Sequence, residues 1–155
     1  MKSLLLSFAF FSFCTVAFAQ NNKAEQKEVR KTVDALFDAM RKGDSTALRK
    51  VFHSSARLQT TFFNKEKKPM IVTDNIDNFV KSVGTPHPEI YDEKLLSYDI
   101  KVDDNLATVW TEYEFYVGTK FSHCGANAFQ LAKTEAGWQI IQITDTRRKE
   151  GCKKK

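Results

Sequence analysis

The amino-acid sequence predicts an α+β fold, in which three N-terminal helices pack on a curved, mainly antiparallel sheet. Apolar residues recur at helical spacing in three segments between residues 24 and 84. Segments between residues 94 and 146 instead follow the two-residue alternation that is typical of strands. The turns between these later segments are too short for parallel crossovers, so neighbouring strands must run antiparallel.

The first helix is predicted over residues 24–42, and a short second helix follows it directly. Gly43 is placed as a C-terminal stop, and Asp44 as the N-cap of the second helix. Asp74 is predicted to cap a third helix that ends at Gly84, ahead of two prolines. The apolar faces of the three helices consist of Val29, Val33, Leu36, Phe37 and Met40, of Ala47, Leu48, Val51 and Phe52, and of Ile76, Phe79, Val80 and Val83.

Six strands are predicted around these helices. Residues 56–63 and 69–72 form a hairpin about the charged turn NKEKK, between the second and third helices. Four more strands follow the third helix, at residues 94–103, 106–117, 121–131 and 138–146.

The N-terminus has the pattern of a secretory signal peptide, which would occupy residues 1–19. A short basic start precedes an apolar run over residues 4–16, and small residues stand at Ala17 and Ala19, the two positions that a signal peptidase reads. We expect cleavage before Gln20 and export to the periplasm or the medium. The apolar run is shorter than the about 20 residues that span a bilayer, so no stable membrane span is expected after cleavage.

The net charge of +5 is concentrated at the C-terminus. The last nine residues, RRKEGCKKK, hold six bases and one acid. We therefore predict one domain over residues 20–146 and a basic tail over residues 147–155. Because the basic residues are not spread over the fold, nucleic acid is not expected to be a partner.

The order of elements resembles the NTF2-like, cystatin-like cone, in particular its SnoaL-like and lumazine-binding branch of small bacterial proteins. Residues 41–52, RKGDSTALRKVF, are similar to the family's helix-Gly-Asp-helix junction. Residues 133–143, KTEAGWQIIQI, are similar to its final hairpin. The resemblance implies a cone between sheet and helices, but this fold carries isomerases, dehydratases, cyclases, transport factors and binding modules, so it does not fix the function.

The hairpin turns predict which side chains share the inner face of the sheet. A three-residue last turn would place Asp145 opposite Gly125 and beside His123, whereas a four-residue turn would bring Trp138, Ile140 and Gln142 inward. The other predicted pairs are Val102 with Ala107, Ile100 with Val109, Tyr98 with Thr111, Leu96 with Tyr113, Val117 with Phe121, Phe115 with His123, Tyr113 with Gly125, Thr111 with Asn127 and Val109 with Phe129.

Several polar residues share this inner face, and they are the candidate site. A buried polar group costs about 1 to 3 kcal/mol unless it is hydrogen-bonded, so these residues need partners. The partners are either a small, partly apolar ligand, for which Gly125 would leave room, or one another in a closed network. The candidates are Tyr98, Thr111, Tyr113, His123, Asn127 and Asp145.

A binding module is the favoured function, and two alternatives remain open. In the first, His123 and Asp145 form an acid-base pair like that of the isomerase and cyclase members, with Tyr98 or Tyr113 donating to an oxyanion. No catalytic aspartate or tyrosine of those enzymes is assigned to a residue of this sequence. In the second, the chain is a dimeric structural or interaction domain. No cofactor is implied, and the three histidines lack metal-ligand spacing.

The outer face of the sheet is predicted to hold a homodimer surface at Trp110 and Tyr116. Glu112 and Glu114 share this face and are interpreted as solvated. Cys124 and Cys152 are a disulfide candidate in an exported chain, and the alternatives are two free thiols or an intermolecular bridge through Cys152.

Overall fold

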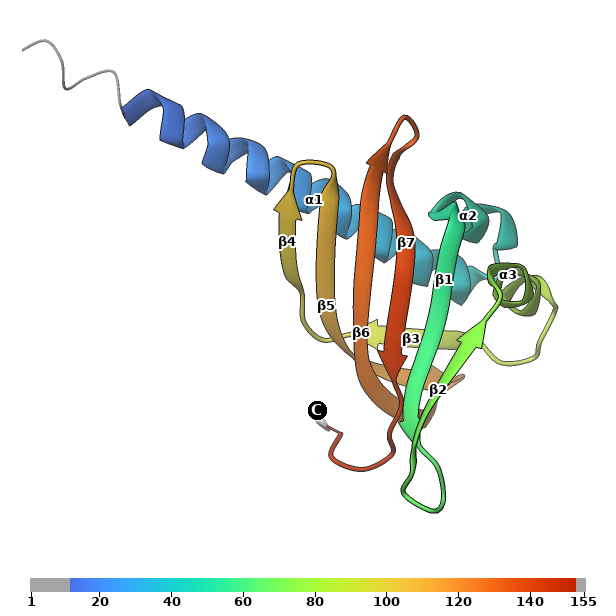
Figure 1. Ribbon diagram of the computed structural model, residues 1–155. Coiled ribbons are helices and arrows are strands. Elements are labelled where there is room, and N and C mark those ends of the chain that lie inside the picture. The colour runs from blue at the N-terminus through green and yellow to red at the C-terminus, as the bar shows by residue number, and fades with distance from the viewer. Residues whose placement is uncertain (1–11, 153–155) are drawn as a thin grey trace, which may run out of the picture.

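The computed structural model describes residues 12–152, with side chains from residue 22 onward, and consists of a bent sheet covered on one face by helices (Figure 1). This is the α+β arrangement that the sequence predicts. In chain order the elements are α1 (Ser12–Lys42), α2 (Ser45–Lys50), β1 (Phe52–Phe63), β2 (Pro69–Asp74), α3 (Ile76–Gly84), β3 (Tyr91–Leu95), β4 (Asp99–Asp103), β5 (Leu106–Val117), β6 (Lys120–Thr134) and β7 (Gly137–Thr146).

Helix α1 begins earlier than its apolar pattern indicates. It starts at Ser12 rather than near residue 24, and it therefore runs through the predicted cleavage point at Gln20. Residues 1–11 of the predicted signal peptide lie outside the described residues. None of the helices in the described part of the chain combines the length and hydrophobicity that a bilayer crossing requires.

The helix ends follow local capping chemistry. Gly43 ends α1 with φ +66°, a conformation that glycine adopts without steric cost. The side chain of Asp44 caps α2 by accepting a hydrogen bond from the Ala47 amide at 2.8 Å. The cap of α3 is Asn75, not Asp74 as predicted, because the Asn75 side chain accepts from the Asp77 amide.

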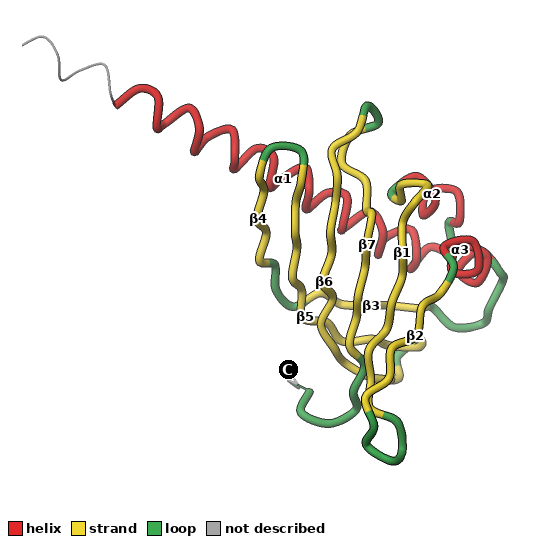
Figure 2. The backbone as a smooth tube through the Cα atoms, in the orientation of Figure 1, coloured by secondary structure: helices red, strands yellow, loops and turns green. Residues whose placement is uncertain are grey.

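The seven strands form one mixed sheet in the order β2-β1-β7-β6-β5-β3, with β4 paired to the other end of β5 (Figure 2). All pairs are antiparallel except β1 with β7, which run parallel. The first strand, β1, and the last strand, β7, are connected by all the chain between them. Their parallel pairing therefore joins the two halves of the sequence in one sheet.

The strand predicted over residues 94–103 is two strands in the structure. The pairs of Ile100 with Val109 and Val102 with Ala107 are confirmed in β4. In β3, however, Tyr113 pairs with Leu95 instead of Leu96, and Tyr98 has no ladder partner. The reason is a break in the strand after β3, where the Ser97 hydroxyl accepts a hydrogen bond from the Glu112 amide at 3.0 Å.

The register of β5 and β6 is confirmed along most of the hairpin, including Thr111 with Asn127, Tyr113 with Gly125 and Phe115 with His123. Near the turn it is wrong by one residue. A bulge between Phe115 and Tyr116 places Tyr116, not Val117, opposite Phe121.

The last hairpin follows neither predicted turn. Its turn has two residues, so Trp138 and Ile140 are buried, and a bulge at Ile141 then returns Ile143 and Asp145 to the inner face. Asp145 consequently lies opposite Asn127 rather than Gly125. One extra residue in a strand moves the side chains beyond it to the opposite face of the sheet. The four-residue turn therefore predicted the correct face for Trp138 and Ile140, before the bulge, and the three-residue turn predicted it for Asp145, after the bulge.

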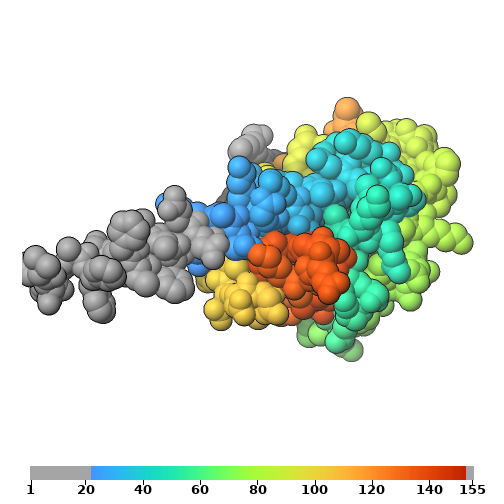
Figure 3. All heavy atoms as spheres, turned by 90° about the horizontal axis from the view of Figure 1, so that it is seen from above, coloured from blue at the N-terminus to red at the C-terminus, as the bar shows by residue number. Residues whose placement is uncertain are grey.

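The core lies between α1 and the inner face of the sheet. Seen from above, α1 lies along one side of the molecule, while hairpins β4–β5 and β6–β7 lie on the other (Figure 3). The largest fully buried core side chains are Tyr113, Phe129, Leu48, Leu131, Ile140, Val29, Val33 and Val109.

Candidate functional site

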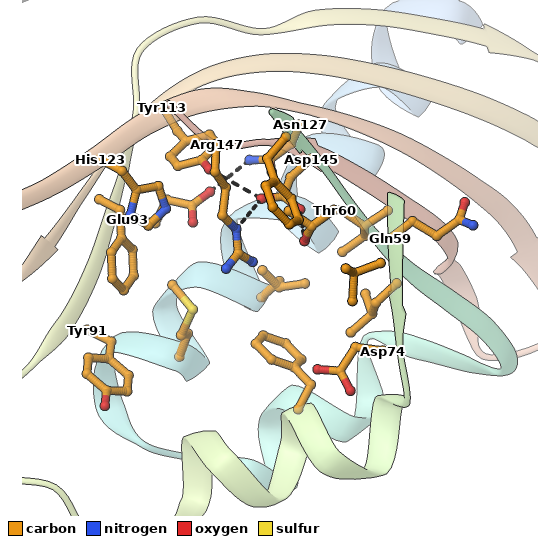
Figure 4. A pocket seen from close by; sticks show the side chains of 18 of the residues that line it. Gln59, Thr60, Asp74, Tyr91, Glu93, Tyr113, His123, Asn127, Asp145 and Arg147 are labelled. Atoms are coloured by element: carbon orange, nitrogen blue, oxygen red, sulfur yellow. Dashed lines mark hydrogen bonds and ion pairs between the residues drawn. The ribbon is translucent and has the colours of Figure 1, made fainter. Parts of the chain in front are cut away.

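A cavity of about 1090 Å³ lies between the sheet and helices α1 and α3 (Figure 4). Cavities of this size accommodate a drug-sized molecule. Aliphatic and aromatic side chains from both helices and from the sheet make up most of its wall, and they are Leu36, Phe37, Met40, Leu58, Phe62, Phe63, Val72, Phe79, Val83, Tyr91, Phe115, Phe129 and Ile143.

Polar groups gather on the sheet side of this cavity, around Asn127. Asn127 is 4% exposed, and its Nδ2 donates to Glu93 Oε1 at 2.8 Å and to Thr111 Oγ1 at 3.3 Å. The contact with Glu93 joins β6 to β3, two strands that are separated by β5 in the sheet. It is short enough to be a strong hydrogen bond.

Asp145 is the centre of a second group of contacts. Its Oδ1 accepts from the Thr60 hydroxyl at 2.5 Å, and its Oδ2 accepts from Arg147 Nε at 2.8 Å and from the Tyr113 hydroxyl at 3.3 Å. The Tyr113 hydroxyl also donates to the Thr146 carbonyl at 2.9 Å. The Asp145 carboxylate, which is 12% exposed, therefore accepts from three donors, one of which is the cationic Arg147.

His123 lines the cavity but is not oriented by Asp145. Its Nδ1 lies 3.1 Å from Ser122 Oγ, and its ring lies against Phe115, with ring centres 4.9 Å apart. The contacts of the described residues include none between His123 and Asp145. Burial, and then the charge of Arg147, lower the pKa of His123, so the imidazole is neutral at pH 7.

Burial strongly alters the acidity of Glu93 in the cavity. Glu93 keeps some exposure as a whole residue, but its carboxyl group is surrounded by protein atoms, and this burial raises its pKa to about 8. The hydrogen bond from Asn127 opposes the shift, and the charge of Asp145 adds to it. At pH 7 the carboxyl is mostly protonated. Burial, followed by the nearby charge of Glu93, also raises the pKa of the Tyr113 hydroxyl.

The structure brings together five of the six predicted site residues. Tyr113, His123, Asn127 and Asp145 line the cavity, and Thr111 lies buried beside Asn127. Tyr98 does not line the cavity. Its hydroxyl donates instead to Asp34 of α1, and the Arg30 guanidinium lies 4.1 Å from its ring centre, because the break after β3 turns this residue toward the helix.

Gly125 does not provide space for a ligand, contrary to prediction. A Cβ atom at this position would lie 1.8 Å from the Thr146 carbonyl oxygen and 2.7 Å from the Tyr113 ring. The space that the missing side chain leaves is filled by the protein itself, so Gly125 positions Tyr113 and the end of β7.

Two site residues, Glu93 and Arg147, were not predicted. Glu93 lies two residues from Tyr91 and from Leu95, so its alternation with apolar neighbours could have indicated an inward position. Arg147 was counted with the basic tail. Its spacing of two residues from Asp145 is the signal that both side chains share one face.

The outer face of the sheet differs in part from prediction. Trp110 is 51% exposed, but Glu114 is only 7% exposed and accepts a hydrogen bond from the Tyr116 hydroxyl at 2.8 Å. Glu114 is therefore not a solvated residue. It pairs with Cys124, which is itself buried on this face.

The chain after β7 folds back along β6. The Arg148 amide and carbonyl exchange hydrogen bonds with Cys124, each at 2.9 Å. The Sγ atoms of Cys124 and Cys152 are placed 2.11 Å apart, with a Cα–Cα distance of 5.8 Å, which suits a disulfide. Oxidation of this pair stays a prediction.

The model of the family described as "Putative lumazine-binding" matches residues 24–144. The comparison with curated proteins found no match.

Solved structures with an NTF2-like, cystatin-like fold are similar to this chain. An NTF2-like protein from Novosphingobium aromaticivorans superposes with a TM-score of 0.69 at 12% identity, covering 94% of this chain and 95% of that one. A "putative dehydratase" of the NTF2-like family from Streptomyces avermitilis gives 0.63 at 12% identity, over 81% and 97%. A "putative aromatic ring hydroxylase" from Novosphingobium aromaticivorans gives 0.61 at 16% identity, over 80% and 89%. At these identities the likeness shows the fold alone.

Proposed function

Because this chain belongs to the NTF2-like family described as "Putative lumazine-binding", we propose that it binds a small, partly apolar molecule in the cavity between sheet and helices. The observation that carries the proposal is the division of the cavity wall. Apolar side chains of α1, α3 and several strands form most of it, while Glu93, Asn127, Asp145 and Arg147 gather on the sheet side. A mostly apolar wall with a few convergent polar groups is typical of a small-molecule site.

Glu93 favours a second candidate function, acid-base catalysis. A carboxyl group with a pKa of about 8 can donate a proton at neutral pH, and the neutral imidazole of His123 in the same cavity can accept one. This version replaces the predicted His123 and Asp145 pair, since Asp145 already binds Thr60 and Arg147. A catalytic role for Glu93 requires that Glu93→Gln stop turnover of the bound molecule while that molecule still binds.

The proposal includes export after cleavage near Ala19, an oxidised Cys124 and Cys152 pair, and a homodimer. The exposed indole of Trp110 and the ring of Tyr116 would lie in the dimer contact on the outer face. An interaction domain without a ligand is the alternative, and it predicts that substitution of Trp110 matters while substitution of cavity residues does not.

Native mass spectrometry of the exported protein, with and without a cavity-filling residue, tests the binding function. Ser82 of α3 lines the cavity and is an exposed residue, so Ser82→Trp would occupy part of the space without overpacking the core. Asn78 is an exposed residue of the same helix that does not line the cavity, and Asn78→Trp is the matched control. We expect a bound small-molecule mass in wild type and in the control that is lost in Ser82→Trp. Equal retention of that mass in both variants would place the molecule elsewhere.

A further inference from the structure

Arg147 presents an unused part of its guanidinium to the cavity. Its Nε donates to Asp145 at 2.8 Å, but the contacts of the described residues include none that engages Nη1 or Nη2. The side chain is 56% exposed although it lines the cavity, and Figure 4 shows the guanidinium directed into that space. Two donor groups are thus available to a bound molecule.

The guanidinium is held in place before any ligand arrives. Asp145 fixes Nε, and Asp145 is itself held by Thr60 and Tyr113. The backbone after Arg147 is tied to β6 through the hydrogen bonds between Arg148 and Cys124. A donor that is already oriented loses little conformational entropy on binding, so its hydrogen bonds contribute more to affinity.

The charges of the cavity wall favour an anion. Three bases line it, Arg147, Arg148 and Lys149, against the carboxylates of Asp74 and Asp145. Glu93 adds little negative charge at pH 7 because burial keeps it mostly protonated. The rest of the wall carries no charge and is mostly apolar, with neutral polar side chains such as Gln59, Thr60, Ser82 and Asn127 among its residues.

We propose that the ligand is an amphipathic carboxylic acid, whose carboxylate accepts hydrogen bonds from the Nη atoms of Arg147 and whose apolar body packs against α1 and α3. This inference rests on the proposed binding function and names the chemical class of its ligand. The forked guanidinium matches the two oxygens of a carboxylate, which a lysine at this position would not do.

Isothermal titration with decanoate and with 1-decanol at pH 7 tests the proposal, because the two probes share a chain length and differ in charge. Wild type is expected to bind decanoate more tightly than 1-decanol. Arg147→Gln is expected to weaken decanoate binding about 10- to 100-fold, since a hydrogen bond to a charged group contributes about 1.5 to 3 kcal/mol. Binding of 1-decanol should change by less than about threefold. Arg57→Gln, the same substitution at an exposed β1 residue outside the cavity, is the control.

The outcomes separate this inference from the function on which it rests. If 1-decanol binds as tightly as decanoate, or if Arg147→Gln leaves decanoate affinity unchanged, the acid class is wrong and the binding function stands. If neither probe binds wild type, both fail. Circular dichroism checks the fold of each variant. If Arg147→Gln does not fold, the comparison of the two probes on wild type decides the matter alone.

Discussion

Asn127 donates a hydrogen bond of 2.8 Å to Glu93, and this contact joins β6 to β3 across the wall of the cavity. The same Asn127 Nδ2 also reaches Thr111. The contact therefore fixes one oxygen of a carboxyl group that burial keeps mostly protonated. It is the clearest sign that the polar residues of the inner face are organised around the cavity.

The protonation of Glu93 makes folding stability depend on pH. The folded-state pKa is about 8, against an ordinary value of 4.5, so between these values the folded protein binds more protons than the unfolded chain. The free energy of unfolding therefore falls as pH rises through this window. Glu93→Gln removes the titration, and we expect it to gain a few kcal/mol relative to wild type between pH 5 and pH 9, at about 1.4 kcal/mol per pKa unit. Urea unfolding at both pH values measures this, and parallel pH slopes for the two proteins would contradict it.

His123 contributes a pH dependence of the opposite sign. Its pKa is lowered in the folded state, chiefly by burial, so below pH 6.5 the unfolded chain binds more protons and stability falls as the solution becomes more acidic. His123→Phe should retain more of its pH 7 melting temperature at pH 5 than wild type does. A pKa of His123 above 6.5, measured by NMR titration of the imidazole, would overturn this account.

Gly125 should not tolerate even one added carbon. Gly125→Ala would place its Cβ 1.8 Å from a backbone oxygen at Thr146, which cannot move without shifting β7. Overpacking of this kind costs about 1 to 3 kcal/mol, and the variant should melt at a lower temperature than wild type. The double variant with Tyr113→Ala separates the causes, because removing the ring leaves the backbone contact in place. Full recovery of stability in that double variant would show that Tyr113, not Thr146, sets the constraint.

The predicted bond between Cys124 and Cys152 would make oxidised and reduced protein differ in stability. A bridge that closes 28 residues of sequence separation restricts the unfolded chain, typically by about 2 to 4 kcal/mol. Cys152→Ser should lose this amount in urea unfolding, and wild type under reducing agent should match the variant. A non-reducing mass equal to that of the fully reduced chain would contradict the pairing.

Much of the fold could be predicted because its signals are local. The apolar spacing of α1 and α3 and the pairing of Val102 with Ala107 across the short β4–β5 turn depend on residues close in sequence. The positions of Asp145 and Tyr98 could not be predicted in this way. The bulge at Ile141 lies where β7 pairs with β6, and the break after β3 lies where Ser97 contacts β5. Both therefore depend on residues of a neighbouring strand, and each changes which face the following residues occupy.

Some residues of the candidate site could be predicted from the sequence and others could not. Tyr113, His123 and Asn127 were placed correctly because the β5–β6 register holds along their part of the hairpin. Glu93 and Arg147 were missed because one lies on a strand that the predicted boundary cut short, and the other follows the last strand in a basic segment. The composition of such a segment predicts that its side chains are solvated, whereas in the structure Arg147 forms an ion pair with Asp145.

Side-chain NMR of the protein during titration with decanoate tests the central claim, that the cavity binds a small amphipathic molecule, most directly. The Asn127 amide group and Arg147 Nε–H report on the cavity, while the Trp110 indole N–H reports on the outer face of the sheet. We predict saturating shifts of the Asn127 and Arg147 signals with little change at Trp110. Saturating shifts at Trp110 with the cavity signals unchanged would show that the cavity is not the binding site.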